Sequence, residues 1–263
     1  SLETILNCKR GKYKKVDISN KFSTEAKVDM HVIDMRDEEI EMEKSISPKL
    51  RDLIKLSLSQ KGQALLFLNR RGYAPLVVCK ACGNQLSCKF CDTKLVEHKE
   101  LNCRLCHQCG SSFPIYNYCE NCGVTDKLKL LGLGVERLLE ECKEIFPKQT
   151  IKIISSDQLK SKGSLQESLL QIEKGEIDIA IGTQILAKGH NFPHLSLVGI
   201  LDGDLGFNSV DLRSAEKTFQ IMQQVSGRVG RFKKSGIVAI QSWRPENEII
   251  QAILEGNDEK FWD

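Results

Sequence analysis

Apolar residues along the chain follow two alternating patterns. Continuous apolar runs between polar residues are typical of strands buried on both faces of a parallel sheet, and apolar residues three or four apart are typical of helices. The runs predict strands at 64–69, 151–155, 177–183, 195–202 and 236–242. The helical spacing predicts helices at 47–62, 135–146, 164–173, 214–225 and 246–254. This alternation indicates right-handed crossovers and an open parallel α/β sheet, with a short edge strand near Val32, Ile33 and Met35.

A cysteine-rich segment interrupts this pattern between the strand at 64–69 and the helix at 135–146. Nine of the eleven cysteines fall between Cys79 and Cys122. Eight of them form C-x-x-C pairs: Cys79/Cys82, Cys88/Cys91, Cys106/Cys109 and Cys119/Cys122. A structural zinc ion takes four such thiolates in a tetrahedron, so four pairs predict two zinc sites. Glycines directly after three of the pairs suit tight turns and favour zinc over an iron–sulfur cluster.

Loop lengths bear on how the pairs combine. Five residues separate the first pair from the second, and fourteen separate the second from the third. The longer spacing suits two knuckles that share a metal, which would nest the second and third pairs inside the first and fourth. An interleaved arrangement stays open on spacing alone. Cys103, His98 and His107 are alternative ligands, but the regular pairs already fill both coordination spheres.

The expected role of this module is structural, because a closed sphere of thiolates leaves no position for a catalytic water. Basic residues in the module offer a surface for DNA or a partner protein, although a solvated face is equally expected: Lys80, Lys89, Lys94, Lys99 and Arg104. The net charge of +3 does not by itself indicate nucleic acid.

The N-terminal segment has no signal-like apolar run, and no stretch reaches the roughly 20 apolar residues of a membrane helix. We therefore expect a cytoplasmic protein without a membrane partner. In a reducing compartment, paired cysteines favour metal over disulfides. Because the chain opens at Ser1 in a charged segment, we also expect it to be part of a longer protein.

Polar and small residues follow the strand predicted at 177–183. Gly182, Thr183 and Gln184 come first, and Lys188 and Gly189 follow. Ligands of open α/β sheets bind at the carboxyl ends of strands, and small or hydroxyl residues allow close approach to a phosphate backbone. The pattern predicts a phosphate-contacting loop.

A second polar motif ends the helix predicted at 214–225. It contains Gln224, Arg228 and Arg231, with glycines between the arginines. Two planar guanidinium groups three residues apart can face one anion, and an arginine supplied by a neighbouring domain can speed phosphoryl transfer by about 10³–10⁵. We expect both arginines to project from the sheet edge that carries Thr183 towards nucleotide held by a separate domain. The alternative is a pair of solvated surface arginines.

Six segments together resemble one family: residues 64–75, the cysteine block, and residues 181–193, 197–204, 211–220 and 223–231. They resemble the primosomal replication-restart helicases of superfamily 2, and the similarity covers nearly the whole chain. The resemblance implies a RecA-like second motor domain and an ATP-dependent 3′-to-5′ DNA helicase that acts at stalled forks. It also implies the nested zinc pairing, with two zinc ions per chain.

For the other residues, the resemblance implies that Gly182, Thr183, Gln184, Lys188 and Gly189 couple DNA contact to the nucleotide state. Gln224, Arg228 and Arg231 would face ATP and magnesium bound by the first motor domain. The implied partners are forked DNA with single-stranded and duplex junctions, primosome proteins, single-stranded DNA-binding protein and the loader of the replicative helicase. The implied location is bacterial cytoplasm at the nucleoid.

The resulting division assigns 1–60 to the end of the first motor domain and a connecting segment. The second motor domain takes 61–78 and 124–243, the zinc module 79–123, and the start of a C-terminal domain 244–263. The chain has no G-x-x-x-x-G-K-[ST] loop, so alone it should not hydrolyse ATP. The run Asp37-Glu38-Glu39 is expected to be solvated. The alternative function is a zinc-stabilised DNA-binding or protein-binding module on an inactive motor scaffold.

Overall fold

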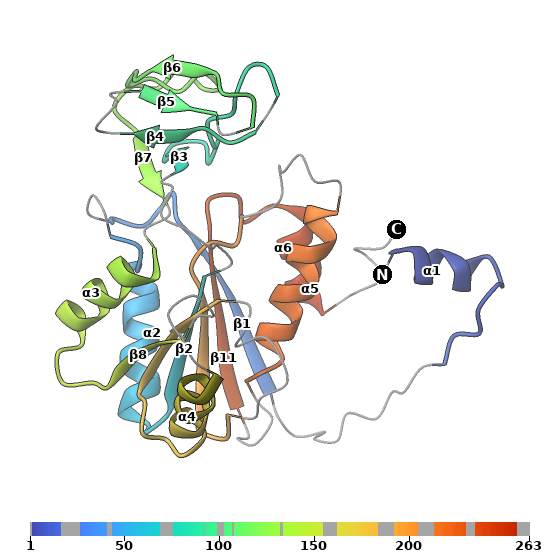
Figure 1. The fold of residues 1–263 in the computed structure, drawn as a ribbon, viewed down its shortest axis with the longest axis vertical. Coiled ribbons are helices and arrows are strands. Elements are labelled where there is room, and N and C mark those ends of the chain that lie inside the picture. Colours follow the sequence, from blue (N-terminus) through green and yellow to red (C-terminus); the bar gives the residue numbers. More distant parts are fainter. Residues whose placement is uncertain are drawn as a thin grey trace.

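In the computed structural model, residues 2–16, 27–40, 44–68, 76–91, 93–98, 103–106, 108–131, 134–154, 162–183, 192–204, 213–229 and 235–256 are described. These residues form a parallel sheet covered by helices on both faces and a small antiparallel sheet beyond the carboxyl ends of its strands (Figure 1). A separate N-terminal helix, α1 (Leu2–Lys9), precedes the first strand. The expected α/β fold with an inserted cysteine module is confirmed.

The central sheet has six strands, in the order β1-β11-β10-β2-β9-β8. All neighbours within it are parallel. The strands are β1 (Lys27–Asp34), β2 (Gln63–Phe67), β8 (Ile151–Ile154), β9 (Ile179–Gly182), β10 (Leu195–Ile200) and β11 (Ser235–Ser242). Every residue of β2 is buried, as expected for a strand in the middle of a parallel sheet.

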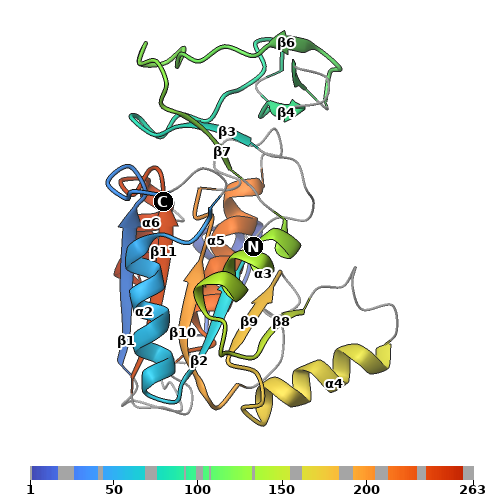
Figure 2. The same cartoon turned by 90° about the vertical axis from the view of Figure 1, so that its left-hand side faces the viewer.

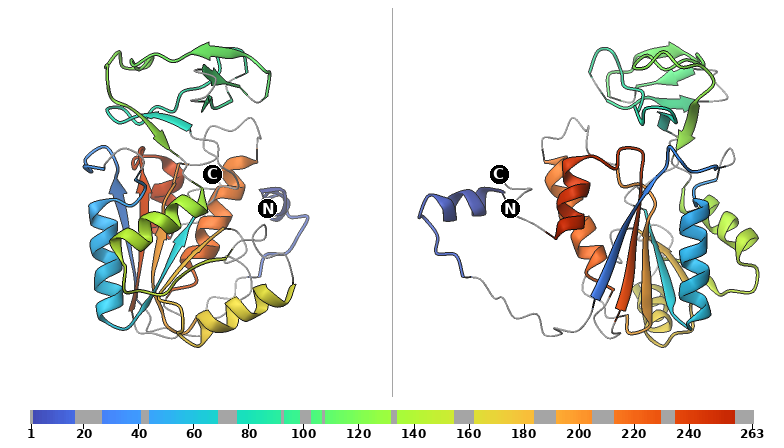
Figure 3. Two further views of the ribbon diagram at one scale, coloured as in Figure 1. Left: turned by 60° about the vertical axis from the view of Figure 1, so that its left-hand side comes forward. Right: turned by 180° about the vertical axis from the view of Figure 1, so that it is seen from behind.

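Helices cover the sheet on both faces, and each face has its own core (Figures 2 and 3). On one face α2 (Pro48–Ser59) and α3 (Val135–Ile145) bury Leu50, Ile54 and Leu138. On the other, α4 (Lys162–Glu173), α5 (Ser214–Ser226) and α6 (Glu248–Glu255) contribute Leu169, Phe219 and other apolar side chains. Burial of these side chains holds the three layers together, at about 1.5–3 kcal/mol for each large one.

The N-terminus of α2 is held by two side chains. Ser47 Oγ accepts a hydrogen bond from the Leu50 N–H at 3.2 Å, as its position before Pro48 predicts. Glu38 accepts from the Lys49 N–H at 3.2 Å and lies 3.1 Å from Lys49 Nζ. The expectation that this acidic run is solvated is wrong for Glu38, which is only 5% exposed, because its carboxylate caps the first turn of α2.

Domain boundaries differ from those expected. β1 pairs along its full length with β11, and α2 packs against the same sheet, although both precede residue 60. At the other end, α6 buries Ala252 and Ile253 in the core shared with α5. β1, α2 and α6 therefore belong to the sheet domain, since they complete its edge and its helical layers.

The inserted module is a second sheet of five short strands, in the order β6-β5-β4-β3-β7. Its strands are β3 (Leu76–Cys79), β4 (Val96–His98), β5 (Cys103–Leu105), β6 (Ser112–Pro114) and β7 (Leu128–Leu131). β3 and β7 pair antiparallel as a two-stranded stem that joins the module to the six-stranded sheet. The module therefore spans residues 76–131 and is wider than the cysteine block.

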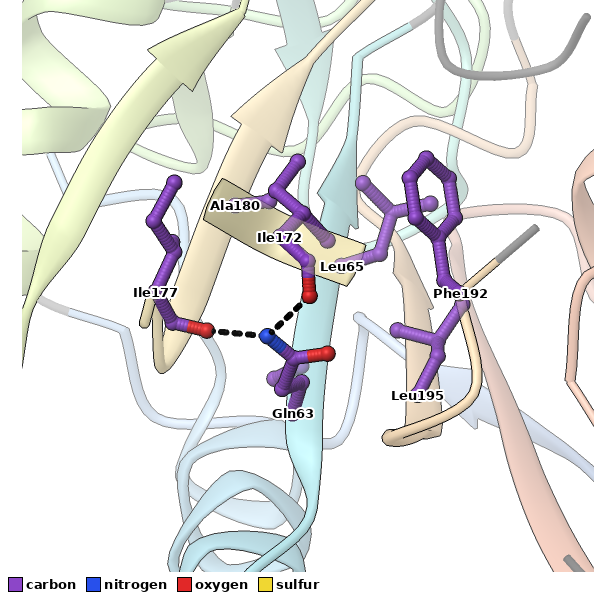
Figure 4. A pocket seen from close by; sticks show the side chains of 8 residues that line it. Gln63, Leu65, Ile172, Ile177, Ala180, Phe192 and Leu195 are labelled. Atoms are coloured by element: carbon purple, nitrogen blue, oxygen red, sulfur yellow. Dashed lines mark hydrogen bonds between the residues drawn. The ribbon is translucent and has the colours of Figure 1, made fainter. Parts of the chain in front are cut away.

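A small cavity lies at the amino edge of the large sheet, beside Gln63 (Figure 4). Gln63 Nε2 donates hydrogen bonds to the carbonyl oxygens of Ile172 at 3.0 Å and Ile177 at 2.5 Å. These bonds fasten the end of α4 to the sheet. The cavity has a volume of only about 10 Å³ and is otherwise lined by apolar side chains, so at most one water fits and it is not a ligand site.

Candidate metal centre

Eight cysteines of the module gather into two groups of four. One group is Cys79, Cys82, Cys119 and Cys122, and the other is Cys88, Cys91, Cys106 and Cys109. Within each group the sulfur atoms all lie within 4.8 Å of one another. The grouping is nested, so the structure does not have the interleaved arrangement that spacing left open. We call the first group the inner site, because its first cysteine ends the stem strand β3, and the second group the outer site.

Sulfur distances fit tetrahedral zinc in both sites. Cys79 Sγ lies 3.7 Å from Cys122 Sγ, and Cys82 Sγ lies 3.7 Å from Cys119 Sγ. In the outer site the corresponding distances are 3.6 Å and 3.3 Å. Zn–S bonds of about 2.3 Å in a tetrahedron place the sulfurs about 3.8 Å apart. All eight cysteines are free thiols, so the groups are not disulfides.

The knuckles repeat one backbone arrangement. Gly83, Gly110 and Gly123 each donate their N–H to the carbonyl of the first cysteine of the pair, at 2.8 Å in all three cases. Their φ angles are +69°, +77° and +72°, in the left-handed region that favours glycine. The glycines that follow three cysteine pairs in the sequence therefore mark the turns that bring both thiols to one side.

Thiol acidity is uneven within each site. Burial raises the pKa of Cys79 to about 12 and that of Cys106 to about 11. At Cys82 burial acts in the same direction, but hydrogen bonds from the Asn84 N–H and the Asn121 side chain outweigh it and bring the pKa to about 7. Hydrogen bonds with Ser111 lower the pKa of Cys109 to about 6. Each site thus has one thiol with a pKa near neutral pH and one with a pKa raised by burial.

The module has little apolar packing of its own. Its apolar core is small, and the buried cysteines Cys88 and Cys106 are part of it beside Val77, Leu86 and Leu95. Cys103 lies on β5 outside both sulfur groups. His107 is outside the described residues, and of His98 only the backbone is described. Neither histidine is needed to fill a coordination sphere.

Basic side chains of the module are mostly engaged within it. Arg104 is buried, lies 3.1 Å from Glu97 and stacks over Tyr116 at 4.6 Å. Lys89 pairs with Glu120 at 2.9 Å, and Lys94 Nζ donates to Ser87 Oγ at 2.8 Å. The expected basic binding surface is therefore not formed by Arg104, which stabilises the module from inside.

The strand β9 places part of the predicted phosphate-contacting loop. Gly182 is its last residue, and Thr183 follows at the carboxyl edge with 5% of its surface exposed. Gln184, Lys188 and Gly189 lie outside the described residues. Phe192, at the other end of this motif, is buried just before β10 begins. Because β9 and β10 are parallel, the two ends of the motif lie at opposite edges of the sheet.

The arginine motif is placed differently from the expectation. Arg228 follows α5, which runs back from the carboxyl edge, and it precedes the first residue of β11 by only seven positions (Figure 3). It therefore lies towards the amino edge, and the expectation that it shares an edge with Thr183 is wrong. The reason is topological, since a helix in a crossover runs antiparallel to its strands. Arg231 lies outside the described residues.

Arg228 is also not a solvated arginine. Only 8% of its surface is exposed, whereas Gln224 on the preceding turn is exposed. A buried guanidinium needs partners that stabilise its charge, so Arg228 is built into the domain and is not a loose surface charge.

Sequence reasoning missed Asp204, which is 4% exposed just beyond β10. It accepts hydrogen bonds from the Ser242 hydroxyl and the Trp243 N–H, both at 2.6 Å. Burial raises the pKa of Asp204 despite these bonds. A signal was present, because Asp202-Gly203-Asp204 directly follows an apolar strand in a parallel-sheet pattern.

No described helix is long and apolar enough to cross a membrane.

Comparison with known proteins connects the fold to a family. Residues 129–233 match the helicase conserved C-terminal domain. The chain is 44% identical over 262 residues to the replication restart protein PriA of Rickettsia conorii, covering 100% of this chain and 40% of that protein. It is 33% identical over 263 residues to PriA of Bacillus subtilis, covering 100% of this chain and 32% of the relative. The chain therefore spans less than half the length of these curated relatives.

The solved structures with a partial likeness to this chain include two helicases. One is S. cerevisiae Dbp5 bound to RNA and ADP BeF3, with a TM-score of 0.40 and 12% identity over 89% of this chain and 39% of that chain. Another is Mss116p DEAD-box helicase domain 2 bound to an RNA duplex, with a TM-score of 0.43 and 13% identity over 88% and 59%. TM-scores this low add no evidence to that from the order of the strands and from the sequence matches. Along its whole length the chain is therefore similar to a segment of PriA replication restart proteins, and residues 129–233 match the helicase conserved C-terminal domain.

Proposed function

We propose that the chain is the second motor domain and zinc module of an ATP-dependent 3′-to-5′ DNA helicase that restarts replication at stalled forks. The observation that carries the proposal is the match to PriA along the whole chain, at 33–44% identity in the two relatives described. The parallel sheet, with its matched C-terminal helicase domain, supports it. Strand separation driven by ATP in the full-length protein tests it, and DNA binding without such separation contradicts it.

In this proposal, nucleotide and magnesium are held by a first motor domain outside this chain. Gly182, Thr183, Gln184, Lys188 and Gly189 would link DNA contact to the nucleotide state, with Thr183 at the carboxyl edge of β9. Gln224, Arg228 and Arg231 would stabilise charge on the nucleotide. Since Arg228 lies towards the amino edge, the nucleotide-bearing domain would approach that side of the sheet.

The proposed partners and location follow the same family. They are forked DNA with single-stranded and duplex junctions, primosome proteins, single-stranded DNA-binding protein and the loader of the replicative helicase, in the bacterial cytoplasm at the nucleoid. The chain alone, without a G-x-x-x-x-G-K-[ST] loop, would not hydrolyse ATP.

We expect two zinc ions per chain, one in each group of four cysteines. The distances between the sulfur atoms fit zinc. Each group consists of four cysteines, and zinc favours four thiolate ligands. Elemental analysis of the purified protein is the measurement. Cys103→Ser should keep both ions, whereas Cys88→Ser should lose the outer one. A single ion per chain in the unsubstituted protein would contradict the proposal that both groups of four cysteines bind metal.

A further inference from the structure

The inner site touches the motor sheet at the turn that follows β11. Arg244 in this turn donates from Nε to the Gly83 carbonyl at 3.3 Å and from Nη2 to Asn84 Oδ1 at 3.2 Å. Gly83 and Asn84 come directly after the first cysteine pair. The guanidinium of Arg244 thus bridges the turn after β11 and the first knuckle. The module lies beyond the carboxyl ends of the large-sheet strands (Figure 2).

Gly83 approaches the same turn more closely than any side chain would allow. A Cβ atom at Gly83 would lie 2.1 Å from the Trp243 carbonyl oxygen and 3.0 Å from its carbon. The equivalent glycines Gly110 and Gly123 share the left-handed φ, but a Cβ there would meet nothing within 4 Å. Gly83 is therefore required by the contact between module and motor as well as by its turn.

On the module side, Asn84 connects this contact to the cysteines. Its carbonyl accepts the Cys79 N–H at 2.8 Å, and its own N–H forms a hydrogen bond to the Cys82 sulfur. Its side chain accepts from Arg244. One residue therefore holds both cysteines of the first pair and the arginine of the motor domain.

On the motor side, Ser242 and Trp243 continue the connection to Asp204. Ser242 Oγ accepts the Arg244 N–H at 2.9 Å and donates to Asp204 Oδ1 at 2.6 Å. The Trp243 N–H donates to Asp204 Oδ2. Val78, next to the ligand Cys79, is fully buried in the same motor core as Trp243. A continuous set of hydrogen bonds and apolar contacts thus runs from the inner cysteines to the carboxyl end of β10.

We propose that Arg244 is a positioning residue that makes the inner metal site part of the motor domain, so that metal in this site orders the turn at 242–247 and its bond to Asp204. At the outer site, by contrast, a Cβ atom at the knuckle glycine Gly110 would meet nothing within 4 Å, so this glycine makes no such close approach to the sheet domain. The inference rests on the proposed zinc binding. It assigns different roles to the two ions: the outer one folds the tip of the module, and the inner one also fixes the module to the carboxyl edge.

Hydrogen exchange of residues 242–247 in the full-length protein, measured with zinc bound and after chelation, tests this role. Chelation should speed exchange of the Trp243 N–H about tenfold or more, as expected when local opening becomes about 1.4 kcal/mol easier. In Arg244→Ala, exchange in this turn should no longer depend on zinc. Glu246→Ala is the matched control, because Glu246 lies in the same turn but pairs with Arg36, and it should keep the dependence.

Two glycine substitutions distinguish loss of the contact between the first knuckle and the turn after β11 from backbone strain within a knuckle. Gly83→Ala and Gly123→Ala place the same left-handed strain next to the same inner site, but only the first collides with Trp243. We expect the zinc dependence of exchange at 242–247 to be lost in Gly83→Ala and kept in Gly123→Ala. Equal behaviour of the two variants would overturn the proposal.

Zinc content measured on the same samples distinguishes the two levels of inference. If the protein contains two ions per chain but chelation does not change hydrogen exchange at 242–247, the proposed role of Arg244 is wrong. The proposed function would not be affected by this result. A protein without metal would overturn the zinc proposal and this inference together.

Discussion

Removal of metal by a chelator is expected to unfold residues 76–131 while the six-stranded sheet stays folded. The module has only a small apolar core, and two of the five buried members of that core are cysteines. Structural zinc sites contribute about 10–16 kcal/mol of apparent binding free energy at neutral pH, which a module of this size cannot replace. The large sheet has two cores of its own that contain no residue of either sulfur group.

Limited proteolysis with and without chelator measures this effect. New cleavage should concentrate within 76–131, and fragments of the large sheet should persist. Cys88→Ser should reproduce the cleavage in the outer part of the module without a chelator. Cys103→Ser is the matched control, a module cysteine outside both groups, and should stay resistant. Resistance of the module after complete loss of zinc would show that it folds without metal.

The second large effect is expected at Arg231. In the full-length protein, Arg231→Ala should lower DNA-stimulated ATP turnover by about 10³, because a guanidinium that neutralises charge on the transferred phosphoryl group adds about 10³–10⁵ in rate. Binding of forked DNA should change little, since the same arginine is not proposed to hold DNA. Steady-state hydrolysis and DNA affinity, measured side by side, separate the two effects.

Lys233→Ala provides the comparison, since it removes a positive charge two residues further along the same segment. It should retain most of the turnover. Arg228→Ala is a different experiment, because Arg228 is buried and its loss should also lower the stability of the domain. Equal turnover in Arg231→Ala and the unsubstituted protein would remove the proposed role of the arginine motif.

Most of the sheet could be predicted from the sequence. The run at 64–69 indicated a buried central strand, and β2 is buried at every position. The alternation of strands and helices predicted that the later strands run parallel to one another. The cysteine spacing predicted the four knuckles. These features are local, because periodicity and C-x-x-C spacing act over a few residues.

Features that depend on contacts distant in sequence could not be predicted. The position of β1 beside β11 joins residues about 200 apart, so the first 60 residues were assigned to another domain. Arg228 was expected beside Thr183, because the pattern shows that a helix is present but not which edge its end reaches. The contact of Arg244 with Gly83 and Asn84 joins two segments that carry no shared motif.

Asp204 shows the same limit. Asp202 and the apolar strand before it mark the position in the sequence, but only the structure shows that Ser242 and Trp243 donate hydrogen bonds to Asp204. An acidic residue at a strand end suggests a ligand site when read alone. Here it fastens one strand end to the turn whose Arg244 contacts the cysteine module.

ATP-driven separation of forked DNA by the full-length protein tests the central proposal most directly. The substrates should be matched duplexes that carry a single-stranded arm with either 3′ or 5′ polarity. We predict ATP-dependent displacement of the strand ahead of a motor that moves 3′ to 5′, and no displacement when ATP is withheld. Tight binding to the same forks without displacement in the presence of ATP and magnesium would contradict the proposal and favour a binding module on an inactive motor fold.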